Sequence, residues 1–347
     1  MRARPARGDP ARRERGPPVS EISLAVVGLG YWGPNLARVV SGLSGTRLRW
    51  CCDREATTRE SLAAVFPDAR FTDSLEEVLA DQAVDGVLLA TPASTHGALA
   101  LDVLSAGKHC FVEKPLALSV ADAQSALDAA LASGRILMVG HLLEYHPGVR
   151  ALAQLIDDGE LGDVHYIYSN RLNLGQLRTD ENALWSLGAH DVSVILSLAG
   201  EQPDELDARG ECYMRAGVED VVFAFLRFPS GLAAHLHLSW LDPHKERRLT
   251  VVGSRRMATF DDMQLERKLT IYDKGFDEKA GSWGEYIARS GASTSPRIAG
   301  SEPLRLEVEH FVDCIRTGAT PRSDGASGLR VVRVLEGLQA ALDRTRR

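Results

Sequence analysis

Residues 22–33 read ISLAVVGLGYWG and decide the fold. A short apolar run, 22–27, leads into glycines at positions 28, 30 and 33, and helical spacing follows. Glycines at this spacing permit a tight strand-to-helix turn, close approach of backbone amides to a pyrophosphate, and packing of the helix on the strand. The stretch therefore predicts the first turn of a doubly wound parallel sheet that binds a dinucleotide.

The same alternation continues to about residue 140. Apolar runs alternate with stretches of helical spacing, which is typical of parallel βαβ units. We predict further strands at 47–53, 84–91, 108–113 and 135–140. We predict helices at 57–66, 74–81, 95–106 and 119–133. Gly107 and Gly134 fit left-handed helix ends, and Ser119 with Asp122 resembles a capping box.

The pattern changes after residue 143. A helix at 147–157 is followed by predicted strands at 163–172, 211–215, 219–228, 231–241 and 248–252. Residues 219–241 indicate a hairpin that turns at 229–231, and helical spacing returns at 303–317 and 327–344. Gly, Ser and charge dominate 274–302, so we predict a loop or lid there. The fold class is thus α/β: an N-terminal Rossmann sheet plus a C-terminal α+β unit with an open, mostly antiparallel sheet.

Length and composition limit the function. The 347 residues suit two domains, which we place at 21–143 and 144–347, after a basic extension at 1–20 that we expect to be disordered. A net charge of -7 and the lack of any apolar run near the roughly 20 residues of a membrane span argue against nucleic acid and membrane partners. Five cysteines without a Cys-x-x-Cys pair indicate a reduced, cytoplasmic protein. His235 and His237 have no evident third ligand, so we expect no metal.

Asp53 follows the second predicted strand. A carboxylate there accepts hydrogen bonds from the ribose hydroxyls of the cofactor and repels a 2'-phosphate, which favours NAD over NADP. Arg54 leaves NADP open, because a guanidinium can pair with that phosphate.

Lys114 stands at the end of another predicted strand, in Glu113-Lys114-Pro115. The carboxyl ends of such strands line the ligand crevice, so the ammonium is expected near a reacting hydroxyl. Thr91, Pro92 and His96 follow the neighbouring strand and are expected in the same crevice.

Four stretches together resemble the Gfo/Idh/MocA family of oxidoreductases over residues 21–345: VVGLGYWGPNLAR, LLATPASTHGALA, KHCFVEKPLALS and VGHLLEYHPGVR. The resemblance implies a Rossmann domain and a C-terminal domain whose open sheet joins subunits. We therefore expect a homodimer or homotetramer formed through that sheet.

The resemblance also implies a catalytic histidine beside the lysine, which is His190 here. Family members often carry an aspartate four residues earlier, and this chain has Ser186 instead. Asp191 points about a quarter-turn away on a helix, so it need not replace that aspartate. We expect Lys114 and His190 to be catalytic.

The remaining site predictions follow from these positions. Expected cofactor contacts are Gly28, Leu29, Gly30, Tyr31, Trp32, Gly33, Asp53, Arg54, Thr91, Pro92, His96, Glu113 and Lys114. Expected substrate contacts are Lys114, Tyr145, Arg171, Asn173, Asn182, Trp185 and His190. Asn170, Arg178 and Asp180 belong to the same polar cluster, for which a solvated loop is the alternative.

The stretches NRLNLG (170–175), NALW (182–185) and SWLDPHKERR (239–248) resemble the sugar or nucleotide-sugar dehydrogenases and ketoreductases of the family. They favour an NAD(P)-dependent enzyme that oxidises or reduces a secondary alcohol or ketone of a sugar. An inositol or cyclitol dehydrogenase, an NAD-dependent glycosidase and a non-catalytic nicotinamide sensor remain as alternatives.

Overall fold

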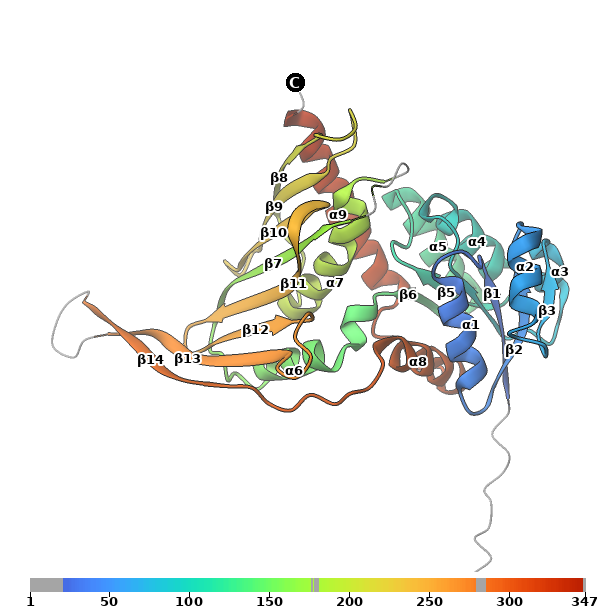
Figure 1. Ribbon diagram of the computed structural model, residues 1–347, viewed down its shortest axis with the longest axis horizontal. Helices are drawn as coiled ribbons and strands as arrows, with labels where there is room; N and C mark the ends of the chain where they lie inside the picture. Colours follow the sequence, from blue (N-terminus) through green and yellow to red (C-terminus); the bar gives the residue numbers. More distant parts are fainter. Residues whose placement is uncertain (1–20, 176, 178–180, 279–284, 346–347) are drawn as a thin grey trace, which may run out of the picture.

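The computed structural model describes residues 21–175, 177, 181–278 and 285–345. The predicted N-terminal extension lies outside these ranges, as do Arg178 and Asp180. Two sheets stand side by side with helices packed on and between them (Figure 1). The first has six parallel strands and the second has eight strands, most of them antiparallel. The predicted fold class is confirmed.

The first sheet has the strand order β3-β2-β1-β4-β5-β6, which is that of a Rossmann fold. Its strands are β1 Ile22–Val27, β2 Thr46–Cys52, β3 Arg70–Thr72, β4 Gly86–Leu89, β5 His109–Glu113 and β6 Leu137–Gly140. Its helices are α1 Gly33–Gly42, α2 Ala56–Ala63, α3 Leu75–Ala80, α4 His96–Ser105 and α5 Val120–Ser133. Sequence reasoning missed only β3, whose three residues are too few for a periodic signal.

The structure confirms the helix ends that were predicted from glycine and capping residues. Gly107 and Gly134 have φ angles of 73° and 63°. Ser119 Oγ accepts a hydrogen bond from the Asp122 amide at 3.1 Å and donates one to its carboxylate at 2.7 Å. The capping motif that opens α5 is therefore confirmed, and α5 in turn covers the sheet behind the lysine.

The second sheet has the order β14-β13-β12-β11-β7-β10-β9-β8, and within it β7 and β10 run parallel. Its strands are β7 Val164–Leu174, β8 Glu205–Glu211, β9 Val221–Arg227, β10 Ala233–Ser239, β11 Leu241–Gly253, β12 Met257–Asp261, β13 Leu269–Glu278 and β14 Tyr286–Thr294. The predicted hairpin is confirmed as β9 and β10. The strand predicted at 211–215 is wrong, because the edge strand β8 ends at Glu211.

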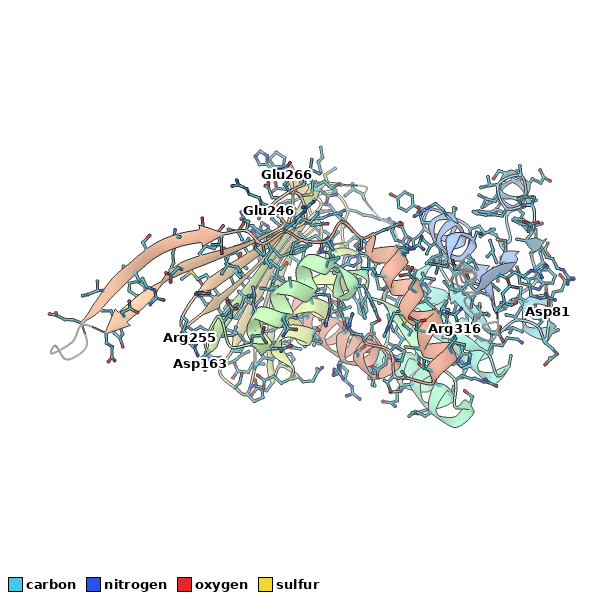
Figure 2. The ribbon with its side chains drawn as sticks, turned by 90° about the horizontal axis from the view of Figure 1, so that it is seen from below. Asp81, Asp163, Glu246, Arg255, Glu266 and Arg316 are labelled. Carbon is cyan, nitrogen blue, oxygen red and sulfur yellow. The ribbon has the colours of Figure 1, made fainter. Side chains whose placement is uncertain are left out.

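The loop predicted at 274–302 is also wrong. Within it, residues 274–278 belong to β13 and residues 286–294 form β14, and the two strands extend as a two-stranded ribbon beyond the rest of the sheet (Figure 1 and Figure 2). Arg289 on β14 pairs across the ribbon with Asp273 (Nε to Oδ1, 3.1 Å) and Asp277 on β13. β14 is exposed on both faces, so the sequence carries none of the apolar alternation by which strands are recognised.

The remaining helices join the two sheets. They are η2 Leu142–Tyr145, α6 Pro147–Asp157, the π-helical turn η3 Leu184–Gly188, α7 Ala189–Ala199, α8 Pro303–Thr317 and α9 Gly325–Thr345. The chain returns to the first sheet at its end: Phe311 on α8 packs against Phe111 on β5 with ring centroids 5.8 Å apart. None of the helices in the described part of the chain has the length and apolar character needed to cross a bilayer.

A buried ion pair fastens α7 to the second sheet. Arg171 on β7 donates to Asp191 on α7 through Nε (2.5 Å) and Nη2 (3.1 Å), and Ser169 Oγ adds a third bond at 2.7 Å. Both charged residues are less than a tenth exposed. Removing either partner would leave the other charge buried and unpaired, which is strongly destabilising. The ion pair therefore fixes the position of Asp191 on α7, and with it that of the adjacent His190.

The glycine turn after β1 is set by close backbone contacts. Gly28 has a φ angle of 87°, and its amide donates to the Cys52 carbonyl at 2.8 Å. A Cβ on Gly33 would lie 1.9 Å from the Gly28 carbonyl oxygen, whereas a Cβ on Gly30 would meet no atom within 4 Å. Gly33 is therefore required by the packing of α1 on the turn, and Gly30 faces open space.

We predict that Gly33→Ala lowers the free energy of unfolding by about 3 kcal/mol, because the added methyl group forces α1 away from the turn. Gly30→Ala is the matched control and should unfold within about 1 kcal/mol of the unsubstituted chain. Denaturant unfolding followed by circular dichroism measures both. Equal stability of the two variants would contradict this account of the turn.

Candidate active site

The acidic residue after β2 lies against the glycine turn. Asp53 Oδ2 accepts a hydrogen bond from the Leu29 amide at 2.6 Å, and Oδ1 accepts one from the Glu55 amide at 2.9 Å. A carboxylate offers about four acceptor positions, so two remain for ribose hydroxyls. The neighbouring Arg54 is exposed, and Tyr31 is 91% exposed.

His96 connects the turns that follow β4 and β5. Its Nδ1 lies 2.7 Å from the Pro115 carbonyl oxygen and its Nε2 lies 2.9 Å from the Thr91 carbonyl oxygen. The ring is 1% exposed, and burial lowers its pKa although the two carbonyls oppose this. A neutral ring has one N–H and donates to only one of these two carbonyls, and its buried position between them ties the turn after β4 to the turn after β5.

Lys114 reaches from the first sheet to the second half of the chain. Its Nζ donates to the backbone carbonyl of Ser186, in η3, at 3.0 Å. The preceding Glu113 carboxylate accepts the Lys114 amide at 3.3 Å. Burial raises the pKa of Glu113 to about 7, and the adjacent ammonium opposes that rise.

His190 lies in the first turn of α7, four residues after Ser186. Its Nδ1 is buried and has no hydrogen-bond partner among the described residues. Burial first, and then the positive charge of Lys114, hold its pKa well below the usual value. Asp191 does not orient it, because both oxygens of that carboxylate bind Arg171 and Ser169. His190 is therefore a neutral imidazole at pH 7 that is able to accept a proton.

Sequence reasoning missed His141, the residue that follows β6. It is 1% exposed, and within the described part of the chain neither ring nitrogen has a hydrogen-bond partner. Burial and the nearby Lys114 ammonium lower its pKa to about 3. Its position at a strand end, like that of Lys114, was the available signal. Lys114, His141 and His190 thus form a group of one cation and two neutral imidazoles that act on one another electrostatically.

The predicted substrate contacts divide into two groups. Asn173 is half-buried, and its buried Oδ1, like His190 Nδ1, has no partner among the described residues. Four of the others have polar groups with partners in the protein: Arg171 with Asp191, Asn182 with Glu219 and Gln339, Trp185 with Gln339, and Tyr145 with Ser323. Asn170 likewise donates to Glu246, which is labelled in Figure 2.

Tyr145 and Asn182 are the most enclosed of the predicted substrate contacts. Tyr145 is 3% exposed and belongs to the core beneath α8. Asn182 Oδ1 accepts a hydrogen bond from the Trp185 amide at 3.1 Å. In this structure the polar groups of both residues make hydrogen bonds within the protein.

The crevice fits a nicotinamide dinucleotide. Gly30 leaves the space in which a pyrophosphate can approach the backbone, and Asp53 keeps acceptors for a ribose. Lys114 contributes a positively charged hydrogen-bond donor to this crevice, and the neutral rings of His141 and His190 contribute hydrogen-bond acceptors. No group of three or more metal-ligating side chains occurs in the described ranges.

Comparison with known proteins agrees with this arrangement. Residues 22–141 match the model for the NAD-binding Rossmann fold of the Gfo/Idh/MocA oxidoreductases, and 149–259 match the model for their C-terminal domain. UDP-N-acetylglucosamine 3-dehydrogenase of Acidithiobacillus ferrooxidans is 28% identical over 93% of this chain and 97% of its own. Its solved structure superposes with a TM-score of 0.82 over 93% of this chain and 98% of that one.

Two further relatives are similar over most of the chain. The scyllo-inositol 2-dehydrogenase (NAD(+)) of Bacillus subtilis is 25% identical over 87% of this chain and 88% of its own. GenD2 from gentamicin A biosynthesis, solved in complex with NAD, is 26% identical over 96% of this chain and 97% of its own, with a TM-score of 0.79. With its glycine turn, its crevice lysine and both matching domain models, this chain belongs to the Gfo/Idh/MocA family of NAD-binding oxidoreductases.

Proposed function

We propose that this protein is a cytoplasmic NAD-dependent dehydrogenase or ketoreductase that acts on a secondary alcohol or ketone of a nucleotide-linked sugar. The observation that carries the proposal is the convergence of Lys114 with two buried, neutral histidines at the mouth of the Rossmann crevice. The similarity to a UDP-N-acetylglucosamine 3-dehydrogenase supports the substrate class. The unpartnered Oδ1 of Asn173 supports a ligand rich in hydroxyl and amide donors.

NAD, when bound, supplies the acceptor or donor of the hydride. The residues of the chain hold and move the proton. Lys114, fixed by the Ser186 carbonyl, places its ammonium beside the reacting oxygen and stabilises negative charge there. His190 accepts the hydroxyl proton, because its lowered pKa keeps it neutral. His141 offers a second acceptor, which orients the hydroxyl.

The first test of this proposal is a substrate comparison. We expect NAD⁺ reduction, followed at 340 nm, with UDP-N-acetylglucosamine or UDP-glucose and at least about tenfold weaker activity with scyllo-inositol, which lacks the nucleotide that a nucleotide-sugar site binds. Higher activity with scyllo-inositol than with the nucleotide sugars would contradict the proposed substrate class. Sugar release without net NADH formation would indicate the NAD-dependent glycosidase, and NADH binding without turnover of any sugar would indicate a sensor.

We also propose that the chain forms a homodimer or homotetramer through its second sheet. Aromatic side chains on β7, β9 and β10 cover one face of this sheet, with Phe223 and Phe225 more than half exposed. His237 stacks on Phe223 at 4.4 Å and His235 stacks on Tyr168 at 5.2 Å. An exposed aromatic face of this kind is typical of a surface that associates with another protein.

Light scattering of the purified chain tests the association. We expect at least a dimer, and a lower mass for the variant Phe223→Asp/Phe225→Asp, because two charges on this face oppose its burial. Leu131→Asp is the control, since Leu131 is 73% exposed on α5, away from this sheet. A monomeric unsubstituted chain, or a double variant of unchanged mass, would contradict the proposal.

A further inference from the structure

Glu307 on α8 is a buried acid with no evident structural role. It is fully buried, and neither carboxyl oxygen has a hydrogen-bond partner among the described residues. Leu304, Val308 and Phe311 lie on the same face of α8 and are also buried. A carboxyl in such surroundings is costly, so its presence needs an explanation beyond packing.

Two other acids lie close to Glu307. Glu113 ends β5 opposite Gly140 of β6, and its carboxyl oxygens would lie 3.1–3.2 Å from a Cβ on that glycine. Glu144 follows β6 in η2, against which α8 packs. The three acids therefore come from adjacent elements and meet beneath α8.

The charge environment agrees with this grouping. Burial, together with Glu113 and Glu144, raises the pKa of Glu307 well above its usual value. Burial raises the pKa of Glu144 to about 8, although Arg322 and Arg330 oppose this. Asp324 and Arg150 also act on the Glu144 carboxyl, with Asp324 raising its pKa and Arg150 lowering it. Tyr145 and His310 are further titratable groups here; their ring centroids are 5.5 Å apart, and Arg322 stacks on Tyr145. Burial and the two neighbouring acids thus favour the protonated form of Glu307, while the pKa values of Glu113 and Glu144 are raised to about 7 and about 8.

The two ends of this group face different surroundings. Glu113 adjoins Lys114 in the crevice. Glu144 lines a surface pocket of about 370 Å³ together with Arg322, Arg330 and Ser327. Glu307 therefore interacts electrostatically both with an acid beside the crevice and with an acid at a second opening to solvent.

We propose that Glu307 is a proton-transfer residue that connects Glu113, beside Lys114, with the solvent pocket at Glu144. The inference rests on the proposed function, because oxidation of an alcohol by NAD⁺ releases one proton. The substrate O–H bond breaks, and its proton passes through the crevice groups to the Glu113 carboxylate. Glu144 releases its proton to water in the pocket, Glu307 passes its own to Glu144, and Glu113 passes the new one to Glu307. One proton leaves, every carboxyl regains its starting state, and no electrons move along this path.

Glu307→Gln tests the proposal, since the amide keeps the shape of the protonated acid but cannot release a proton. With the best nucleotide sugar and NAD⁺, we expect turnover to fall about tenfold and its pH profile to change, with KM and NADH affinity unaltered. Glu144→Gln, at the pocket, should slow turnover in the same way without altering the core. Glu309→Gln is the control, because Glu309 is on the same helix but pairs with Arg305 in solvent.

Infrared spectroscopy of the full chain at pH 7 gives a readout that needs no substrate. The carbonyl band of a protonated carboxyl should be present and should weaken in Glu307→Gln. Turnover and pH profiles of Glu307→Gln and Glu144→Gln that equal those of the unsubstituted enzyme would overturn the relay and leave the proposed function intact. Lack of turnover in the unsubstituted enzyme would instead overturn the proposed function.

Discussion

The hydrogen bond from Lys114 Nζ to the Ser186 carbonyl is the contact on which the candidate site depends, because it joins the first sheet to the second half of the chain at the crevice. Lys114 directly follows β5, and the Ser186 carbonyl belongs to η3. Helix α7 begins directly after η3, with His190 in its first turn. A π-helical turn is rare and is often found at functional sites. Here it places a backbone acceptor opposite the lysine and a histidine beside it.

The charge in the crevice depends on which of its buried ionisable side chains are paired with an opposite charge. Arg171 is neutralised by Asp191, so it fastens β7 to α7 and adds only a distant positive charge to the site. The Lys114 ammonium faces His141 and His190, and together with burial it keeps both histidines neutral. Ser186 stands where many family members have a carboxylate, and this chain uses its backbone carbonyl to hold the lysine. Proton acceptance in this site therefore depends on burial and on Lys114, without a carboxylate partner for His190.

Features dictated by the backbone were predictable from the sequence. The glycine turn, Asp53 and Lys114 occupy fixed places relative to parallel strands, so spacing alone located them. Hydrogen-bond partners were not predictable: Arg171, Asn182 and Trp185 read as ligand contacts, but their partners lie on elements distant in sequence. His141 gave only a weak signal, and the helical spacing at 303–317 did not single out Glu307, whose complete burial only the structure shows. The ribbon of β13 and β14 was not predicted, because a strand that is exposed on both faces lacks the alternation of apolar and polar residues by which strands are recognised.

We propose that Lys114 serves the reaction and not the binding of the cofactor. The most direct measurement compares turnover and NADH affinity in the unsubstituted enzyme and in Lys114→Ala, with the best nucleotide sugar as substrate and NADH fluorescence for affinity. The account predicts that turnover falls at least about 100-fold while the Kd for NADH changes by less than about threefold. Equal losses in turnover and NADH affinity, or unchanged turnover, would contradict it.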